Sequence, residues 1–419
     1  METEYKKLED NYNNNNNINN NEEPEYPIIY NYIFFIIFLC IGLINNLGFV
    51  LILSLSQLIS KQLNNSQLIA LFPLSLICFN SLSRIINSRY FIKISYTKRF
   101  LCLSFYIFSG YLLLYYILDS IGTHNSLFNF FLTLIPVIIL GTASSLGEAT
   151  MLGYLRTFPK EYVSGWGSGT GMAGVVGASL SLIVKKNNWI LKDVYYNISL
   201  VGILYFILYF ISKKLKEFLE EKYNISFERN SDVSINKELN KQNLKIGFCF
   251  AKRYLLNLFF IFFFEYLIII GFCERISRRK FEIFINDFYF RKFIYESFML
   301  CYQIGVFISR SSLSLIKNLT YVEIFPIFQF LNLCFWIFEY YYFLTDNYFF
   351  LFCHLIFIGL CAGSCYVLSF YLLIGDENIE KEFKELCINI GTIFDDFGIF
   401  LASIVVLILD NSLLFIQRQ

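Results

Sequence analysis

The chain has 419 residues, of which 56% are hydrophobic, 20% aromatic and only 16% charged. Soluble domains are usually about a quarter charged, so this composition argues against a soluble enzyme. The net charge of +1 leaves no electrostatic footprint for nucleic acid, and no nucleic-acid partner is expected.

Long apolar runs recur along the sequence and predict an all-α, multi-pass integral membrane protein embedded in a lipid bilayer. A spanning helix needs about 20 mostly apolar residues. By this criterion we expect about eleven transmembrane helices, at 32–57, 68–87, 100–118, 127–155, 165–184, 194–212, 254–273, 292–315, 321–343, 348–374 and 389–409. Residues 1–30 are polar and rich in Asn, so they are predicted to form a disordered cytoplasmic tail.

One charged stretch, 213–253, divides the apolar runs into six and five. The sequence therefore predicts an N-terminal bundle at 31–212, a charged cytoplasmic loop, and a C-terminal bundle at 254–419. This layout resembles a major-facilitator-like transporter that lacks its last helix. The analogy concerns architecture and says nothing about a substrate.

The distribution of Lys and Arg predicts the orientation, because cytoplasmic loops carry an excess of both. A cytoplasmic N-terminus puts the strongly basic central stretch on the cytoplasmic side, although the basic loop 275–292 then faces the lumen. An odd number of spans places the C-terminus in the lumen. The sequon that begins at Asn64 is then lumenal and is a candidate for N-glycosylation.

Several acidic side chains interrupt the apolar runs, where each charge costs about 2.5–3.5 kcal/mol near the bilayer centre. Glu148 lies in the fourth span, Glu265 in the seventh, and Asp395 and Asp396 in the eleventh. Each is expected to pair with another side chain or to line a wet cavity. At least one of the two aspartates must face the bundle interior. For Glu148, a structural contact with an arginine such as Arg156 or with a hydroxyl, and a role as a cavity-facing carboxylate, all stay open.

The eighth span carries a polar stripe, in which Glu296, Gln303 and Arg310 recur at intervals of seven residues. One polar face on an apolar helix is predicted to point into the bundle. Glu296 is expected near the membrane surface, where a long side chain can reach the headgroups. Arg310 lies deeper and is well suited to hold an anionic substrate, or it pairs structurally with Glu265 or Asp395.

The fifth span is rich in glycine, and Gly167, Gly171 and Gly174 share one helix face. Small residues let helix backbones approach closely, which favours a packing role. The alternative is a locally unwound backbone that faces a substrate.

The sequence offers few candidates for catalytic or metal-binding residues. Only two histidines, His124 and His354, are present, and most of the cysteines lie in apolar runs without a metal-ligand pattern. No catalytic residue, metal or cofactor is expected, and the chain is not predicted to be an enzyme.

Several sequence blocks, taken together, resemble the battenin family of ceroid-lipofuscinosis membrane proteins of lysosomes. They extend over most of the chain from about residue 40 to residue 410. The blocks are Asn45 with Asn46; 144–150, SSLGEAT; 164–171, SGWGSGTG; 264–266, FEY; 302–312, YQIGVFISRSS; 331–333, LNL; and Asp395 with 398–399, GI, and 401–403, LAS.

The resemblance implies a lysosomal, endolysosomal or vacuolar membrane and a role in clearing glycerophosphodiesters, with effects on lumenal pH. It also marks Glu148, Glu265, Arg310 and Asp395 as positions shared with the family. The main hypothesis is a transporter that exports a small anionic metabolite. The alternative is a membrane scaffold that regulates endolysosomal trafficking and pH without transporting anything.

Two further partners are predicted. Carboxyl groups buried in a bilayer can take up a proton from an acidic lumen, so proton coupling through Glu148, Glu265 and Asp395 is a hypothesis. Tyr5 and Leu8 fit the Tyr-x-x-apolar pattern that cytosolic sorting adaptors bind.

Overall fold

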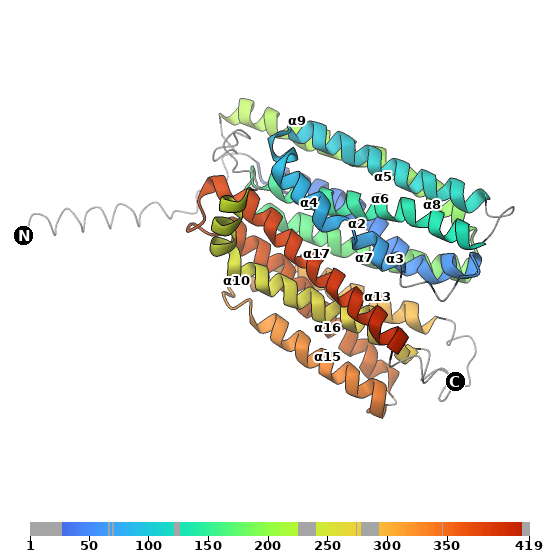
Figure 1. Ribbon diagram of the computed structural model, residues 1–419. Helices are drawn as coiled ribbons and strands as arrows, with labels where there is room; N and C mark the ends of the chain where they lie inside the picture. Colours follow the sequence, from blue (N-terminus) through green and yellow to red (C-terminus); the bar gives the residue numbers. More distant parts are fainter. Residues whose placement is uncertain are drawn as a thin grey trace, which may run out of the picture.

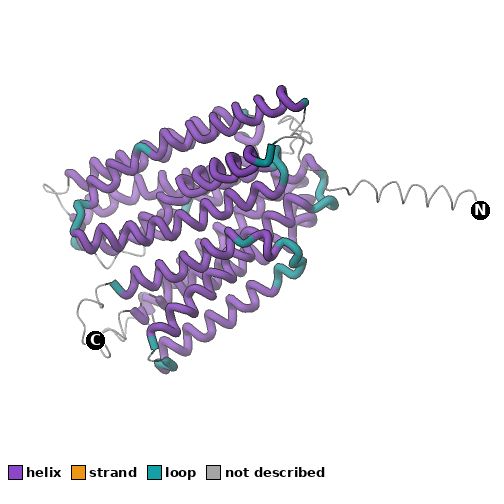
Figure 2. Tube along the Cα trace, turned by 180° about the vertical axis from the view of Figure 1, so that it is seen from behind, coloured by secondary structure: helices purple, strands orange, loops and turns teal. Residues whose placement is uncertain are grey.

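The computed structural model describes residues 27–65, 68, 71–120, 126–224, 240–273, 275–277, 293–345 and 347–412. This part of the chain is built from helices and their connections (Figures 1 and 2). The main helices are α2 (Ile29–Gln62), α3 (Leu71–Ile77), α4 (Asn80–Arg89), α5 (Tyr96–Asp119), α6 (Ser126–Leu155), α7 (Val163–Asn187), α8 (Leu191–Ser199), α9 (Val201–Tyr223), α10 (Lys241–Tyr266), α13 (Ile294–Ser311), α14 (Leu313–Ile316), α15 (Ile324–Tyr342), α16 (Tyr348–Gly375) and α17 (Lys381–Ser412). A π-helical segment, η6 (Leu267–Cys273), extends α10, and the short helices η2 (Phe91–Lys93) and η4 (Lys160–Tyr162) lie in connections.

The helices form two halves, an N-terminal half from α2 to α9 and a C-terminal half from α10 to α17. Figure 1 shows the first above the second. The halves meet along two seams. Helix α7 packs against α13 and α16 in one seam, and α17 packs against α3, α4 and α6 in the other.

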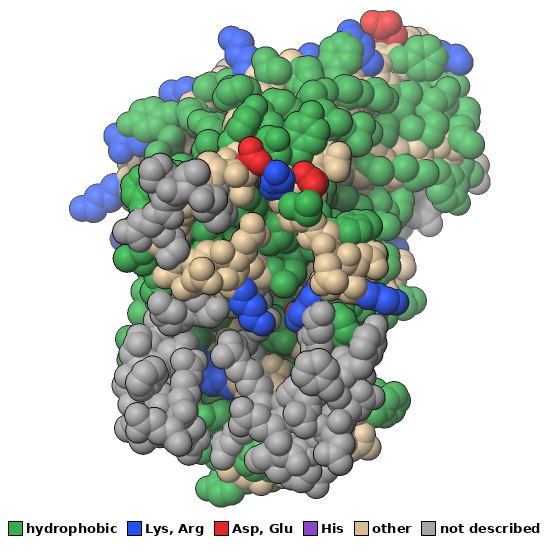
Figure 3. Space-filling view, turned by 90° about the vertical axis from the view of Figure 1, so that its right-hand side faces the viewer, with side chains coloured by type: hydrophobic (Ala, Val, Ile, Leu, Met, Phe, Trp, Pro, Cys, Tyr) green, Lys and Arg blue, Asp and Glu red, His purple; other side chains and the backbone are tan. Residues whose placement is uncertain are grey.

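Successive long helices run in alternating directions and define two ends of the bundle (Figure 1). We name as the basic end the one where α9 finishes and where α10 and α17 begin. Its lysines on these three helices are Lys213, Lys214, Lys216, Lys222, Lys241, Lys245, Lys381 and Lys384. Helices α2, α7 and α17 finish at the opposite end, where the visible described surface is mostly hydrophobic with scattered Lys and Arg (Figure 3).

Nine segments of the described chain are long and apolar enough to cross a membrane. Their outer faces keep large apolar side chains exposed, such as Phe105 on α5 and Phe349 on α16. Exposed apolar surface of this extent is typical of contact with lipid. The prediction of an all-α, multi-pass membrane protein is therefore confirmed, whereas the count of eleven spans stays a prediction.

The two expected spans outside these nine depart from a simple apolar helix. The expected span 68–87 is divided into α3 and α4, and α4 buries polar residues that include Asn80, Arg84 and Asn87. The expected span 292–315 is divided into α13, which ends at Ser311, and the short helix α14, and α13 carries charges at both ends. Both α4 and α13 contain polar residues that are buried in the bundle, and these residues make the two segments less apolar than the nine candidate spans.

The boundaries around the charged stretch 213–253 also differ from the expectation. Helix α9 continues to Tyr223, and α10 begins at Lys241, so both ends of this stretch are helical rather than loop. The sixth expected span, 194–212, is divided between α8 and α9. Lys and Glu are good helix formers, so polarity alone does not end a helix.

Helix α7 is continuous from Val163 to Asn187, which contradicts the alternative of a locally unwound glycine segment. The predicted glycine face packs against the C-terminal half. A Cβ atom on Gly171 would stand 2.9 Å from the Cα atom of Phe307 in α13, and Gly174 faces the side chain of Gln303. Gly167 similarly approaches α16. A second glycine face, which includes Gly165, Gly169 and Gly177, packs against α2. Helix α7 therefore joins the two halves through close backbone contact.

Gly171→Ala is expected to destabilise the protein, because its methyl group would press on the backbone of α13. Overpacking costs about 1–3 kcal/mol, which exceeds the gain of about 1 kcal/mol in helix propensity. The matched control is Gly391→Ala in α17, where the new methyl group would lie 3.4 Å from the Phe370 ring in ordinary contact. Thermal unfolding of the purified variants tests this. A Gly171→Ala protein as stable as Gly391→Ala would contradict the close packing.

Candidate functional site

A cavity of about 130 Å³ lies between the two halves. Its volume is sufficient for several water molecules, so charged side chains can face it without being fully dehydrated. The five residues predicted from the sequence as a transport path all line it, namely Glu148, Glu265, Gln303, Arg310 and Asp395. The structure thus brings together residues from α6, α10, α13 and α17.

The first part of the site is a cluster of three carboxylates around Arg84, which is buried in α4. Its Nη2 atom donates to Glu148 over 2.7 Å and lies 3.8 Å from Asp395. Its Nε atom pairs with Asp396 and lies 2.7 Å from the Ser145 hydroxyl. One guanidinium is therefore shared among three acidic groups, which leaves this arginine little attraction for a further anion.

The sequence analysis missed Arg84 and did not include Asp396 among the predicted transport-path residues. A signal was present, because Asn80, Arg84 and Asn87 have the spacing of one helix face. Asp396 accepts a hydrogen bond from Asn80 over 3.2 Å, so both aspartates face the interior.

The suggested contact between Glu148 and Arg156 is wrong. Glu148 pairs with Arg84, while Arg156 lies 3.4 Å from Glu385 in α17. Helical spacing identified the face of Glu148 but could not identify a partner on another helix.

The second part of the site is Arg310, near the end of α13. Its Nη1 atom donates to the Thr170 hydroxyl of α7 over 2.7 Å. Its guanidinium carbon lies 4.2 Å from the centre of the Tyr366 ring, a cation–π contact. Its Nε atom has no hydrogen-bond partner, and among the described residues no carboxylate lies within 4.0 Å of it. The expected structural pair with Glu265 or Asp395 is therefore not formed.

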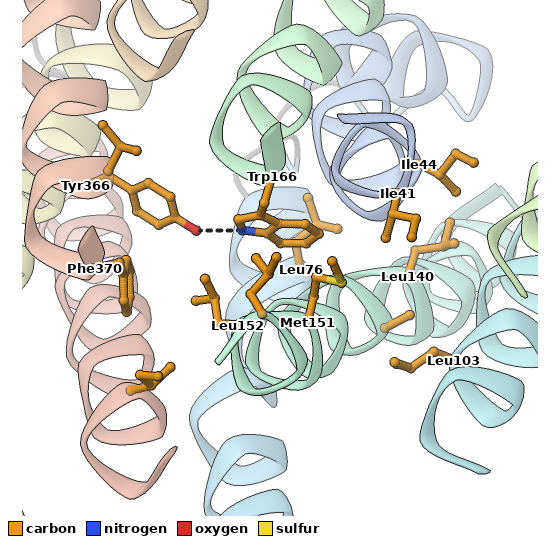
Figure 4. Packing of buried hydrophobic residues seen from close by; sticks show 14 of the residues in the cluster. Ile41, Ile44, Leu76, Leu103, Leu140, Met151, Leu152, Trp166, Tyr366 and Phe370 are labelled. Atoms are coloured by element: carbon orange, nitrogen blue, oxygen red, sulfur yellow. Dashed lines mark hydrogen bonds between the residues drawn. The ribbon is translucent and has the colours of Figure 1, made fainter. Parts of the chain in front are cut away.

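Tyr366 of α16 links the two parts of the site. Its hydroxyl donates to Glu148 and accepts from the indole nitrogen of Trp166 over 3.4 Å. Figure 4 shows the Trp166 ring held among apolar side chains of the N-terminal half while Tyr366 reaches it from α16. Tyr366 therefore contacts both Arg310 and Glu148, which belongs to the Arg84 cluster.

The third part of the site is Glu265, at the point where α10 becomes π-helical. Glu265 is 1% exposed. Its Oε1 atom accepts a hydrogen bond from the Tyr302 hydroxyl, and its Oε2 atom has no partner. Single π-helical turns often occur at functional sites, because they reorient the side chains around them.

Glu296 lies in the first turn of α13, near the opposite end of the bundle, but its side chain does not extend outward as expected. It is buried, and it pairs with Lys185 at the end of α7. The apolar surroundings make an unpaired charge costly, so the lysine from the other half accompanies it.

The glycosylation candidate Asn64 is not among the residues that line the cavity. Asn64 is exposed directly after α2, at the opposite end, with a left-handed φ of 54°. Tyr5 and Leu8 lie outside the described residues.

Comparison with known proteins identifies the family. The sequence model of the family described as CLN3 protein matches residues 35–247 and 224–415. Battenin of Dictyostelium discoideum is 29% identical over 93% of this chain and 96% of its own length. Protein btn1 of Schizosaccharomyces pombe is 30% identical over 91% of this chain and 94% of its own length. Battenin of Canis lupus familiaris is 26% identical over 67% of this chain and 65% of its own length.

Solved structures identify the fold. A bacterial homologue of the iron transporter ferroportin in an outward-facing state has a TM-score of 0.62 at 12% identity, over 90% of this chain and 93% of its own. The proton:xylose symporter XylE, of the major facilitator superfamily, has a TM-score of 0.60 at 10% identity, over 94% of this chain and 91% of its own. The human organic anion transporter MFSD10 has a TM-score of 0.57 at 9% identity, over 93% of this chain and 94% of its own. The chain therefore belongs to the CLN3 protein family, the battenins, and folds as a multi-pass membrane protein of the major-facilitator type.

Proposed function

We propose that this protein transports a small anionic organic metabolite, of the glycerophosphodiester class, out of a lysosomal, endolysosomal or vacuolar lumen. The observation that carries the proposal is the contrast between the two cavity arginines. Arg84 is surrounded by three carboxylates, whereas the Arg310 guanidinium contacts the Thr170 hydroxyl and the Tyr366 ring and pairs with no carboxylate of the described residues. Of the two, Arg310 is the cation available to an anion that enters the cavity.

A phosphodiester matches the chemistry of this position. A guanidinium binds two phosphate oxygens through parallel hydrogen bonds, and its planar geometry selects that arrangement. The unpartnered Nε atom of Arg310 supplies a donor for such a contact. The unpartnered Oε2 atom of Glu265 supplies an acceptor for a hydroxyl or ammonium group elsewhere on the metabolite.

Uptake into proteoliposomes that contain the purified protein tests the proposal. We expect saturable uptake of a labelled glycerophosphodiester and no protein-dependent uptake of uncharged glycerol. The scaffold alternative predicts no uptake of either compound by a folded protein. Equal uptake of both compounds would argue against anion recognition.

Proton coupling through Glu148, Glu265 and Asp395 is part of the proposal. All three side chains line the cavity, and each carboxylate can bind and release one proton, which an amide in its place cannot do. Glu148→Gln, Glu265→Gln and Asp395→Asn are each expected to flatten the dependence of uptake on lumenal pH. The pH profile is measured with the cytoplasmic side held constant. Three unchanged profiles would restrict these residues to structural pairing.

The proposed orientation has a cytoplasmic N-terminus, with the basic end in the cytosol and Asn64 in the lumen. In intact vesicles, external protease is expected to digest an N-terminal tag and to spare a C-terminal tag. A glycosidase is expected to increase the mobility of the parent protein on a gel but not that of Asn64→Gln. Equal protection of both tags would contradict an odd number of spans.

A further inference from the structure

Glu385, in the second turn of α17, belongs to a buried ionic cluster that lies outside the cavity. It is 0% exposed, and two arginines of the N-terminal half converge on it. Arg99 of α5 donates to Glu385 Oε1 over 3.2 Å, and Arg156, directly after α6, lies 3.4 Å from Oε2. The Tyr96 hydroxyl donates to Oε2 over 3.2 Å. One carboxylate of the C-terminal half thus connects three side chains of the other half.

The local packing is built around this carboxylate. A Cβ atom on Gly153 of α6 would stand 3.1 Å from Glu385 Oε1, so glycine leaves room for it. The Nε atom of Arg99 donates to two backbone carbonyls, those of Phe91 and Ile94, which fixes the guanidinium in place. The Arg99 guanidinium is therefore held by backbone groups of its own half as well as by Glu385.

The cluster closes the basic end of the seam between the halves. Asp396 lines the cavity eleven residues after Glu385, which is about 16 Å along α17 at 1.5 Å per residue. Between them Asn87 of α4 donates to Asn389 of α17 over 3.2 Å. A polar contact between the two halves thus lies between the cavity and the Glu385 cluster.

At the opposite end the arrangement is simpler. The cavity lining extends to Tyr295, in the first turn of α13. Beside it, within the described part of the chain, an ion pair between Lys185 of α7 and Glu296 of α13 joins the two halves. The cavity therefore approaches this end closely but is separated from the basic end by the Glu385 cluster.

We propose that Glu385 with Arg99 and Arg156 is a gate that holds the basic end closed and must open before the cavity communicates with that side. This inference rests on the proposed transport function, because a protein that does not transport needs no alternating access. While these ion pairs are intact, they stabilise the conformation that is closed at the basic end. Their loss shifts the conformational equilibrium towards a state open at the basic end.

The experiment uses a cysteine placed between the gate and the cavity. Ser88 of α4 is 0% exposed, and its hydroxyl donates to the carbonyl of Arg84 over 2.8 Å. Ser88→Cys keeps a small side chain there. Sealed vesicles with the basic end outward are treated with a membrane-impermeant thiol reagent without substrate. Parallel proteins that keep Ser88 give the background from native cysteines.

Glu385→Gln is expected to raise the labelling rate of Ser88→Cys at least about tenfold, while gel filtration shows a folded protein. Glu296→Gln breaks the buried ion pair between Lys185 and Glu296 at the opposite end. This variant is expected to leave the labelling rate of Ser88→Cys unchanged. Glu217→Gln, which breaks an exposed pair with Lys214, is the surface control. An equal rise in Glu296→Gln would indicate general loosening and would overturn the gate.

If Glu385→Gln does not fold, Arg156→Gln takes its place, because it leaves the pair with Arg99 intact. An unchanged labelling rate in the folded variant then rejects the gate. The labelling needs no substrate, so its outcome is separate from that of the uptake assay. A raised rate in a protein that takes up no glycerophosphodiester supports the gate and rejects the proposed substrate.

Discussion

Arg310→Lys is expected to reduce glycerophosphodiester uptake at least about tenfold while the protein still folds. A hydrogen bond to a charged group contributes about 1.5–3 kcal/mol, and each 1.4 kcal/mol corresponds to a factor of ten. Lysine keeps the charge but replaces the planar fork with a point charge, so one of two parallel contacts is lost. Uptake at subsaturating substrate, normalised to reconstituted protein, measures the change.

Arg310→Ala is expected to do more damage, because it also removes the hydrogen bond to Thr170 and the contact with the Tyr366 ring. Lower thermal stability should therefore accompany its loss of uptake. The matched control is Arg253→Lys, which changes an arginine that is 46% exposed and paired with Glu323 at the basic end. Its uptake should equal that of the parent. Parent-like uptake by a folded Arg310→Lys protein would return Arg310 to a structural role.

The cavity residues that the sequence predicted share one property: each is a conspicuous polar group within a strongly apolar run. Glu148, Glu265 and Arg310 stand out because the bilayer penalises charge and because long apolar runs identify the bilayer segments. Helical spacing then placed Gln303 on the face of Arg310. Single-helix periodicity was sufficient for these predictions, since each concerned the direction of one side chain relative to its own helix.

Partners between helices could not be predicted in the same way. Arg84 lies in the middle of α4, a short helix with many polar residues, so its charge did not stand out there. Lys185 pairs with Glu296, 111 residues away in the sequence, and Arg84 pairs with Glu148 at a distance of 64 residues. Such ion pairs depend on how the helices pack in three dimensions. From the sequence alone, each buried charge has many possible partners on other helices.

Arg84→Gln is expected to cause the largest loss of stability. It leaves Glu148, Asp395 and Asp396 facing one another without a cation. Removing one partner of a buried ion pair costs about 3–5 kcal/mol, because the charge left behind is unpaired and dehydrated. Thermal unfolding and the yield of monodisperse protein measure the effect. The control is Arg253→Gln, which breaks a partly exposed pair and should cost no more than about 1 kcal/mol.

Two explanations for the lost stability of Arg84→Gln can be distinguished, namely the unpaired carboxylates and the changed shape of the side chain. If unpaired carboxylates destabilise Arg84→Gln, adding Asp396→Asn should recover part of the lost stability, since one negative charge is removed while the size is kept. Acidic pH should also reduce the difference between Arg84→Gln and the parent, because protonated carboxyl groups no longer need a cation. A double variant no more stable than Arg84→Gln, with a deficit that is constant across pH, would show that Arg84 acts through packing. The cation would then not be what holds the three carboxylates of α6 and α17 together.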